Sequence, residues 1–93
     1  MRYGTIAKLK ILPGKIDEFL AVADTAPNGI VFEHIYQLDS GNDEYMLAVG
    51  FESKEAYQAN AASPEMHQLF LQYRALLAAD PEWHDGVILQ SRP

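Results

Sequence analysis

The stretch FESKEAYQANAASPEMHQLF, residues 51–70, predicts the end of a strand followed by a helix that stops and restarts. Ser53 is placed to cap a helix that begins at Lys54 and continues to about Ala62. Ser63 and the proline after it are the favoured start of a second helix, because proline's missing N–H would be unpaired at the first helical position anyway. The serine–proline pair therefore marks a joint between two helical pieces.

Apolar periodicity and turn residues predict the other elements. Strands are expected over residues 2–12, 30–38, 44–51 and 87–91, and a first helix over residues 15–24. The order β-α-β-β-α-β is the ferredoxin-like arrangement, so we predict an α+β fold in which both helical regions cover one face of a four-stranded antiparallel sheet. The sequence has no repeat, linker or low-complexity segment, and all 93 residues are expected to form a single domain.

The face of this sheet without helices is predicted to be partly apolar. On the second strand, alternation predicts that the side chains facing the helices are those of Phe32, His34, Tyr36 and Leu38. The side chains on the helix-free face include those of Met46, Ala48, Gly50, Ile6 and Ile88. A contiguous apolar patch marks an interaction surface, so a homodimer that pairs sheet against sheet is expected. A solvated face with scattered apolar residues is the alternative.

Composition narrows the classes of partner. The formal charge is −6, with thirteen acidic against seven basic side chains, and such a surface repels the phosphate backbone of nucleic acids. No stretch approaches the roughly 20 apolar residues of a membrane span. The first fourteen residues carry no signal-peptide hydrophobic run, and the chain has no cysteine. We therefore expect a cytoplasmic protein that binds neither nucleic acid nor membrane.

Three stretches, ILPGKIDEFL, FESKEAYQANAASPE and PEWHDG, resemble the antibiotic biosynthesis monooxygenase family of dimeric α/β-barrel proteins. The family's PGK-x-x-EF turn and helix match the segment that starts at Pro13. Its F-x-S-x-E-A-x-x-A-H-x-x-S-P pattern matches at Phe51, Ser53, Glu55, Ala56, Ala59, Ser63 and Pro64. Asn60 stands where the family has a helical histidine. The resemblance spans nearly the whole chain, and the spacing of the second pattern is its most specific part.

The resemblance implies a function as well as a fold. Family members oxidise quinols or polyketide anthrones with molecular oxygen and no cofactor, some relatives degrade haem, and others have no known activity. It also implies a dimeric α/β barrel with a ligand pocket between the helices and the sheet of each protomer. The expected function is a monooxygenase without cofactor or metal that acts on a small phenolic, quinol-like or polyketide-like molecule. A ligand-binding or regulatory module without chemistry is the main alternative.

Three side chains are candidates for catalysis. Cofactor-free oxygenation needs a base, donors that stabilise the substrate anion, and an apolar enclosure. Asn60 could donate to a substrate oxygen, or it could be a surface amide near the helical joint. His67 could act as a base, since the unperturbed pKa of histidine as a residue type is near 6.5, or lie at the flank of the buried stripe. His34 is the histidine expected to be most enclosed, although a buried, hydrogen-bonded imidazole would fit the same position.

Aromatic residues are the candidates for substrate binding. They are Tyr36, Tyr57, Phe70, Tyr73 and Trp83. The tyrosines could donate to a bound oxygen or could be core residues, and Trp83 could anchor the turn before the last strand or the dimer contact. Arg74 is expected to pair with an acid on the helix surface or with an anionic substrate.

Other chemistries have little support in the sequence. The three histidines lack the tight spacing of a metal site, and the phosphate-binding and serine-hydrolase motifs are absent. Haem degradation would need a proximal histidine on the long helix, where His67 is the candidate. An RNA-binding domain of the same topology would need basic residues on the third strand, and EYMLAVGF has none.

Overall fold

The computed structural model describes residues 1–24, 29–41 and 43–92. Its elements, in chain order, are β1 (Tyr3–Lys10), α1 (Ile16–Ala23), β2 (Ile30–Gln37), β3 (Glu44–Phe51), α2 (Lys54–Ala61), α3 (Pro64–Ala75) and β4 (Glu82–Val87). This order confirms the predicted β-α-β-β-α-β arrangement, with the second helical region divided in two.

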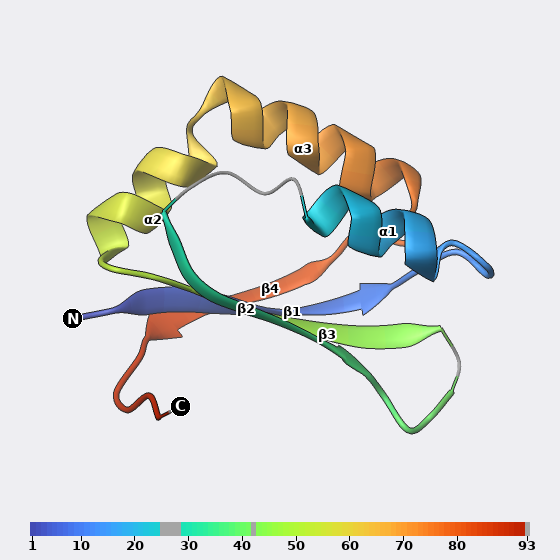
Figure 1. The fold of residues 1–93 in the computed structure, drawn as a ribbon, viewed down its shortest axis with the longest axis horizontal. Coiled ribbons are helices and arrows are strands. Elements are labelled where there is room, and N and C mark those ends of the chain that lie inside the picture. Colours follow the sequence, from blue (N-terminus) through green and yellow to red (C-terminus); the bar gives the residue numbers. More distant parts are fainter. Residues whose placement is uncertain (25–28, 42, 93) are drawn as a thin grey trace.

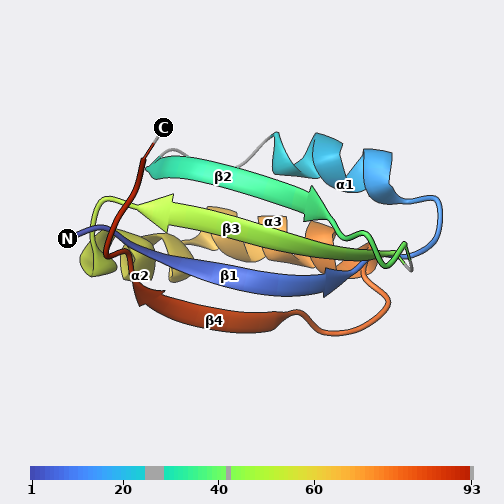
Figure 2. The same cartoon turned by 90° about the horizontal axis from the view of Figure 1, so that it is seen from below.

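The four strands form one sheet in the order β2-β3-β1-β4, and every neighbouring pair is antiparallel. Figure 1 shows all three helices above the same face of this sheet, and Figure 2 shows the four strands from the uncovered side. The α+β ferredoxin-like fold predicted from the sequence is therefore confirmed. Among the described residues, none of the helices has the length and apolar character needed to cross a membrane.

The joint between α2 and α3 has the predicted form. The Ser53 hydroxyl accepts a hydrogen bond from the backbone N–H of Ala56 at 3.0 Å, and the Ser63 hydroxyl accepts from that of Met66 at 3.1 Å. The Ser63 hydroxyl also donates to the backbone carbonyl of Asn60 at 2.8 Å. One serine therefore closes the end of α2 and the start of α3, and it fixes the backbone beside Asn60.

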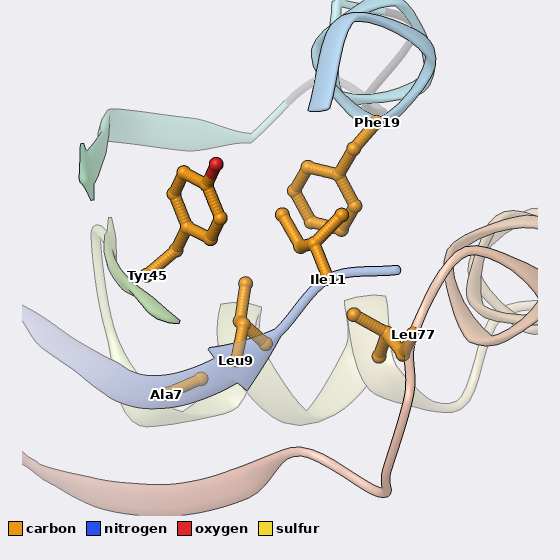
Figure 3. Packing of buried hydrophobic residues seen from close by; sticks show 6 residues of the cluster. All are labelled: Ala7, Leu9, Ile11, Phe19, Tyr45 and Leu77. Carbon is orange, nitrogen blue, oxygen red and sulfur yellow. The ribbon is translucent and has the colours of Figure 1, made fainter. Parts of the chain in front are cut away.

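The hydrophobic core lies between the sheet, α1 and the end of α3. It consists of Ala7, Leu9, Ile11, Phe19, Tyr45 and Leu77 (Figure 3). Arg74 stabilises the chain just after α3, since its Nε donates to Asp80 Oδ1 at 2.8 Å and its guanidinium also donates to the Leu77 carbonyl at 3.1 Å. Arg74 thus pairs with an acid, as expected, but this acid lies beyond α3 rather than on the helix surface.

The prediction for the faces of β2 was wrong. Glu33 lies opposite Val49 and Ile35 opposite Leu47, and side chains that are directly opposite share a face. Ile35 packs against the core, whereas His34 and Tyr36 are exposed on the helix-free face. The register between β2 and β3 shifts between Ile30 and Phe32. Because β2 carries apolar residues in both phases, its alternation could not decide which face is buried.

The predicted position of the last strand was also wrong. The strand covers Glu82–Val87 rather than residues 87–91, and it pairs Trp83 with Ala7 and Asp85 with Thr5. Asp and Gly disfavour strands by propensity. At this edge of the sheet, pairing with β1 supplies the backbone hydrogen bonds of β4. All side chains of β4 are exposed, so polar residues are tolerated there. Trp83 and Asp85 consequently lie on a strand, on its helix-covered face.

Candidate functional site

A cavity of about 460 Å³ lies between the sheet and the helices α2 and α3. Ligand pockets in proteins typically enclose roughly 300–1,000 Å³, so this volume suits a small organic molecule. Six aromatic side chains contribute to its lining: Phe19, Phe51, Tyr57, Phe70, Tyr73 and Trp83. The core adjoins the cavity, because Leu9, Phe19 and Leu77 belong to both. The cavity is thus the unfilled part of the same layer.

Six of the eight residues selected from the sequence line this cavity. They are Asn60, His67, Tyr57, Phe70, Tyr73 and Trp83. Asn60 is half-buried near the end of α2, and His67 is exposed at the cavity rim one turn into α3. His34 and Tyr36 do not line the cavity, because β2 presents them to the helix-free face. There the His34 ring stacks on Phe32, with the ring centroids 5.6 Å apart, and lies tilted to Tyr36 at a centroid separation of 6.4 Å.

Tyr57 and Asp85 form a polar pair in the cavity wall. The Tyr57 hydroxyl donates to Asp85 Oδ1 at 3.0 Å, which joins α2 to β4. The Tyr57 ring packs against Tyr3 and Phe51, each with a centroid separation of 5.3 Å. Burial raises the pKa of Tyr57 to about 12, and the hydrogen bond to the carboxylate of Asp85 adds to the shift. Tyr57 is therefore a neutral donor that is already engaged.

Glu33 and Asp85 are cavity residues that were missed in the sequence. The alternation expected for β2 turns Glu33 away from the helices, and the expected last strand, residues 87–91, leaves Asp85 outside it. Burial raises the pKa of Glu33, and the negative charge of Asp24 raises it further. Burial likewise raises the pKa of Tyr73, with Glu33 and Asp24 as the contributing charges. The glutamate within the apolar run IVFEHIY could have pointed to Glu33 as a functional residue, because strands disfavour glutamate.

The cavity is acidic. Among the described residues that line it, Glu33 and Asp85 are carboxylates, His67 is the one residue that could become cationic, and no lysine or arginine is present. Within the described part of the chain, no group of three or more His, Asp or Glu side chains could hold a metal ion. The site is therefore an apolar, aromatic chamber with an amide, phenolic hydroxyls and carboxylates in its wall.

Replacing Tyr57 with phenylalanine is expected to change how the free energy of unfolding depends on pH above about pH 10. The folded-state pKa of about 12 exceeds the ordinary value of 10.0, so Tyr57 contributes stability below about pH 10 that is lost toward about pH 12. The variant should therefore lose less unfolding free energy over this window than the wild type. It should also be less stable near neutrality by about 1 kcal/mol, for the lost hydrogen bond. Urea unfolding as a function of pH measures both, and parallel alkaline limbs would contradict the role of this tyrosine.

The fold and the cavity together define a small α+β domain with a ligand-sized chamber between its helices and its sheet. Several solved structures share this fold. A protein from Chloroflexus aurantiacus that is provisionally named an antibiotic biosynthesis monooxygenase is 24% identical with a TM-score of 0.79, and the match covers 100% of this chain and 98% of that one. Rv0793 from Mycobacterium tuberculosis is 19% identical with a TM-score of 0.77, covering 100% of both chains.

A third structure with this fold has a named activity. It is an asparagine-to-alanine variant of SnoaB, a cofactor-independent oxygenase from Streptomyces nogalater. Its identity is 18% and its TM-score 0.81, with 99% of this chain and 97% of that chain covered. No protein-family model and no curated protein matches the sequence. At these identities the likeness establishes the fold, and it agrees with the family resemblance drawn from residues 51–64.

Proposed function

We propose that the protein is a cofactor-independent monooxygenase that oxidises a small planar phenolic, quinol-type or polyketide-like molecule with O₂. The observation that carries this proposal is the half-buried amide of Asn60 in the wall of an apolar, aromatic-lined cavity. The shared fold with SnoaB, which is named a cofactor-independent oxygenase, supports the same activity.

In the proposed reaction the substrate supplies the electrons. Loss of a proton gives an electron-rich phenolate or enolate, which reacts with O₂. One oxygen atom enters the substrate and the other leaves as water, so an anthrone-type CH₂ becomes a carbonyl and its two hydrogens leave in that water. Asn60 would donate a hydrogen bond to the oxygen that carries the developing negative charge. Phe70, Tyr73 and Trp83 would hold the flat ring, and the dry wall would strengthen the polar contacts.

The activity is tested by incubating the protein with anthrone or 1,4-dihydroxynaphthalene under ¹⁸O₂, without added metal or flavin, and analysing the product by mass spectrometry. The wild type should incorporate one labelled oxygen. Asn60→Ala should lower kcat by about 10²-fold, because removal of one donor to an oxyanion has an effect of that order. Gln58→Ala is the matched control, since Gln58 is an exposed amide on the same helix and does not line the cavity.

The same samples distinguish a ligand-binding module without catalytic activity from the proposed enzyme. A probe that raises the melting temperature and is recovered unchanged would favour the module over the monooxygenase. Haem degradation is less favoured, because the carboxylates of Glu33 and Asp85 would repel a dianionic porphyrin in a cavity whose described lining has no lysine or arginine.

We further propose that two copies of the chain pair through the helix-free face of the sheet. Ile6 and Tyr36 on this face are 49% and 55% exposed. A shallow hollow lies around them and is also lined by Met46 and Ala48. A two-fold axis would place this patch against itself, so that each copy covers the apolar side chains of the other.

A further inference from the structure

Glu33 occupies the middle of β2 and lies on the side of the sheet that the helices cover. Its cross-strand partner is Val49, which is buried beneath the helices, and side chains directly opposite share a face. The Glu33 side chain is half-buried and lines the cavity together with Leu47 and Tyr73. An ionisable group thus stands in a wall that is otherwise mainly apolar.

The carboxylate of Glu33 has no polar partner within the part of the chain that the structure describes. The other carboxylate of the lining, on Asp85, already accepts a hydrogen bond from Tyr57. Glu33 makes no hydrogen bond or ion pair with a described residue, and the charge that acts on it, from Asp24, has the same sign. A partly buried carboxylate without a partner is unfavourable, so a ligand that donates a hydrogen bond would relieve this cost.

We propose that Glu33 is the proton acceptor of the cavity and takes the proton of the substrate's acidic hydroxyl. This assignment rests on the proposed monooxygenase function and identifies the group that starts it. The substrate O–H bond breaks, its electron pair stays on the substrate oxygen, and a new O–H bond forms on the Glu33 carboxylate. The resulting anion is the form that reacts with O₂. The preferred substrates are therefore hydroxylated aromatics without a carboxylate, because a second negative charge would be repelled by Glu33 and Asp85.

The surroundings of Glu33 suit it to this task. Burial and the charge of Asp24 raise the pKa of Glu33 toward the operating pH, where a general base is most effective. The other titratable groups of the cavity wall are Tyr73 and His67 from α3, Tyr57 from α2 and Asp85 from β4. Tyr73 has a raised pKa and stays protonated, so it does not compete for the substrate proton.

The kinetic test compares wild type, Glu33→Gln and Glu33→Asp on 1,4-dihydroxynaphthalene under oxygen as a function of pH. In the wild type, kcat/KM should rise with pH through a midpoint above the ordinary glutamate pKa. Glu33→Gln should lower kcat by about 10²-fold or more and abolish the rise of kcat/KM with pH. Glu33→Asp should keep this rise but with a lower rate. The control Glu52→Gln changes an exposed acid and should leave rate and profile unchanged. Wild-type rate and profile in Glu33→Gln would overturn the proposal.

A binding test separates this assignment from the proposed function. The probes are 1-naphthol, which donates a hydrogen bond, and 1-methoxynaphthalene, which cannot. The wild type should bind 1-naphthol about tenfold more tightly, and Glu33→Gln should lose most of this preference, because a bond to an ionised acceptor is about twice as strong as a neutral one. That result without turnover of any probe would refute the monooxygenase while supporting Glu33 as the acceptor. An equal preference for 1-naphthol in wild type and Glu33→Gln would overturn the assignment, whether or not turnover occurs.

Discussion

Replacing Ile11 with alanine is expected to lower the free energy of unfolding by about 2–5 kcal/mol. Ile11 is 1% exposed and lies in the core cluster, against Leu77 just after α3. The change removes buried methyl groups and leaves a void that the surrounding residues fill only in part. A domain of this size has a total stability of about 5–15 kcal/mol, so the variant should be close to unfolding at physiological temperature.

The matched control for Ile11 is Leu71→Ala. Leu71 is also a branched aliphatic residue, but it lies on α3 and is 50% exposed. Its replacement should change stability by no more than about 0.5 kcal/mol. Both variants are compared with the wild type by urea unfolding at one fixed protein concentration, since association would add a concentration-dependent term. Equal losses for the two variants would show that the core does not centre on Ile11.

Replacing Ala48 with aspartate is expected to convert the proposed dimer into a monomer of 10.4 kDa. Ala48 lies in the central strand pair of the helix-free face, opposite Ile6 in β1 and His34 in β2. In a two-fold dimer the substitution enters the interface twice, and each unpaired buried carboxylate costs several kcal/mol. The same change in an isolated protomer would leave the charge in water at little cost.

Light scattering after size exclusion measures the effect. The wild type should have twice the mass of one chain, and Ala48→Asp should elute with the mass of one. Gln68→Asp introduces the same charge on the exposed surface of α3 and should remain dimeric. A wild-type particle of 10.4 kDa at working concentration would contradict the proposed sheet-to-sheet dimer. A dimeric Ala48→Asp variant would place the contact elsewhere.

The bounds of the helices and the apolar face of α3 could be predicted from the sequence alone, whereas the cavity was implied only by the family resemblance. The serine caps and the proline at the start of α3 are local signals, and they set the bounds of both helices around Asn60 and His67. Apolar residues at helical spacing then directed Phe70 and Tyr73 toward the sheet. Each of these features depends on interactions between residues a few positions apart, so each can be recognised in a short window.

The cavity-lining residues that were not predicted from the sequence lie on strands. In β3, alternation puts the side chains of Tyr45, Val49 and Phe51 on the same face of the strand. This face is buried, as predicted. β2 has apolar residues in both phases, and its irregular register with β3 determines that Glu33 rather than His34 points toward the helices.

The sequence by itself determined the order of the elements, the helical joint and the apolar face of α3, because caps, turns and helical periodicity are short-range. Only the tertiary structure decided which face of β2 is covered, and that EWHDGV rather than VILQS forms the edge strand. Those outcomes depend on hydrogen bonds to strands distant in the chain, which can override local propensity and shift a register by one residue. These long-range strand pairings therefore place Glu33 and Asp85 in the cavity wall.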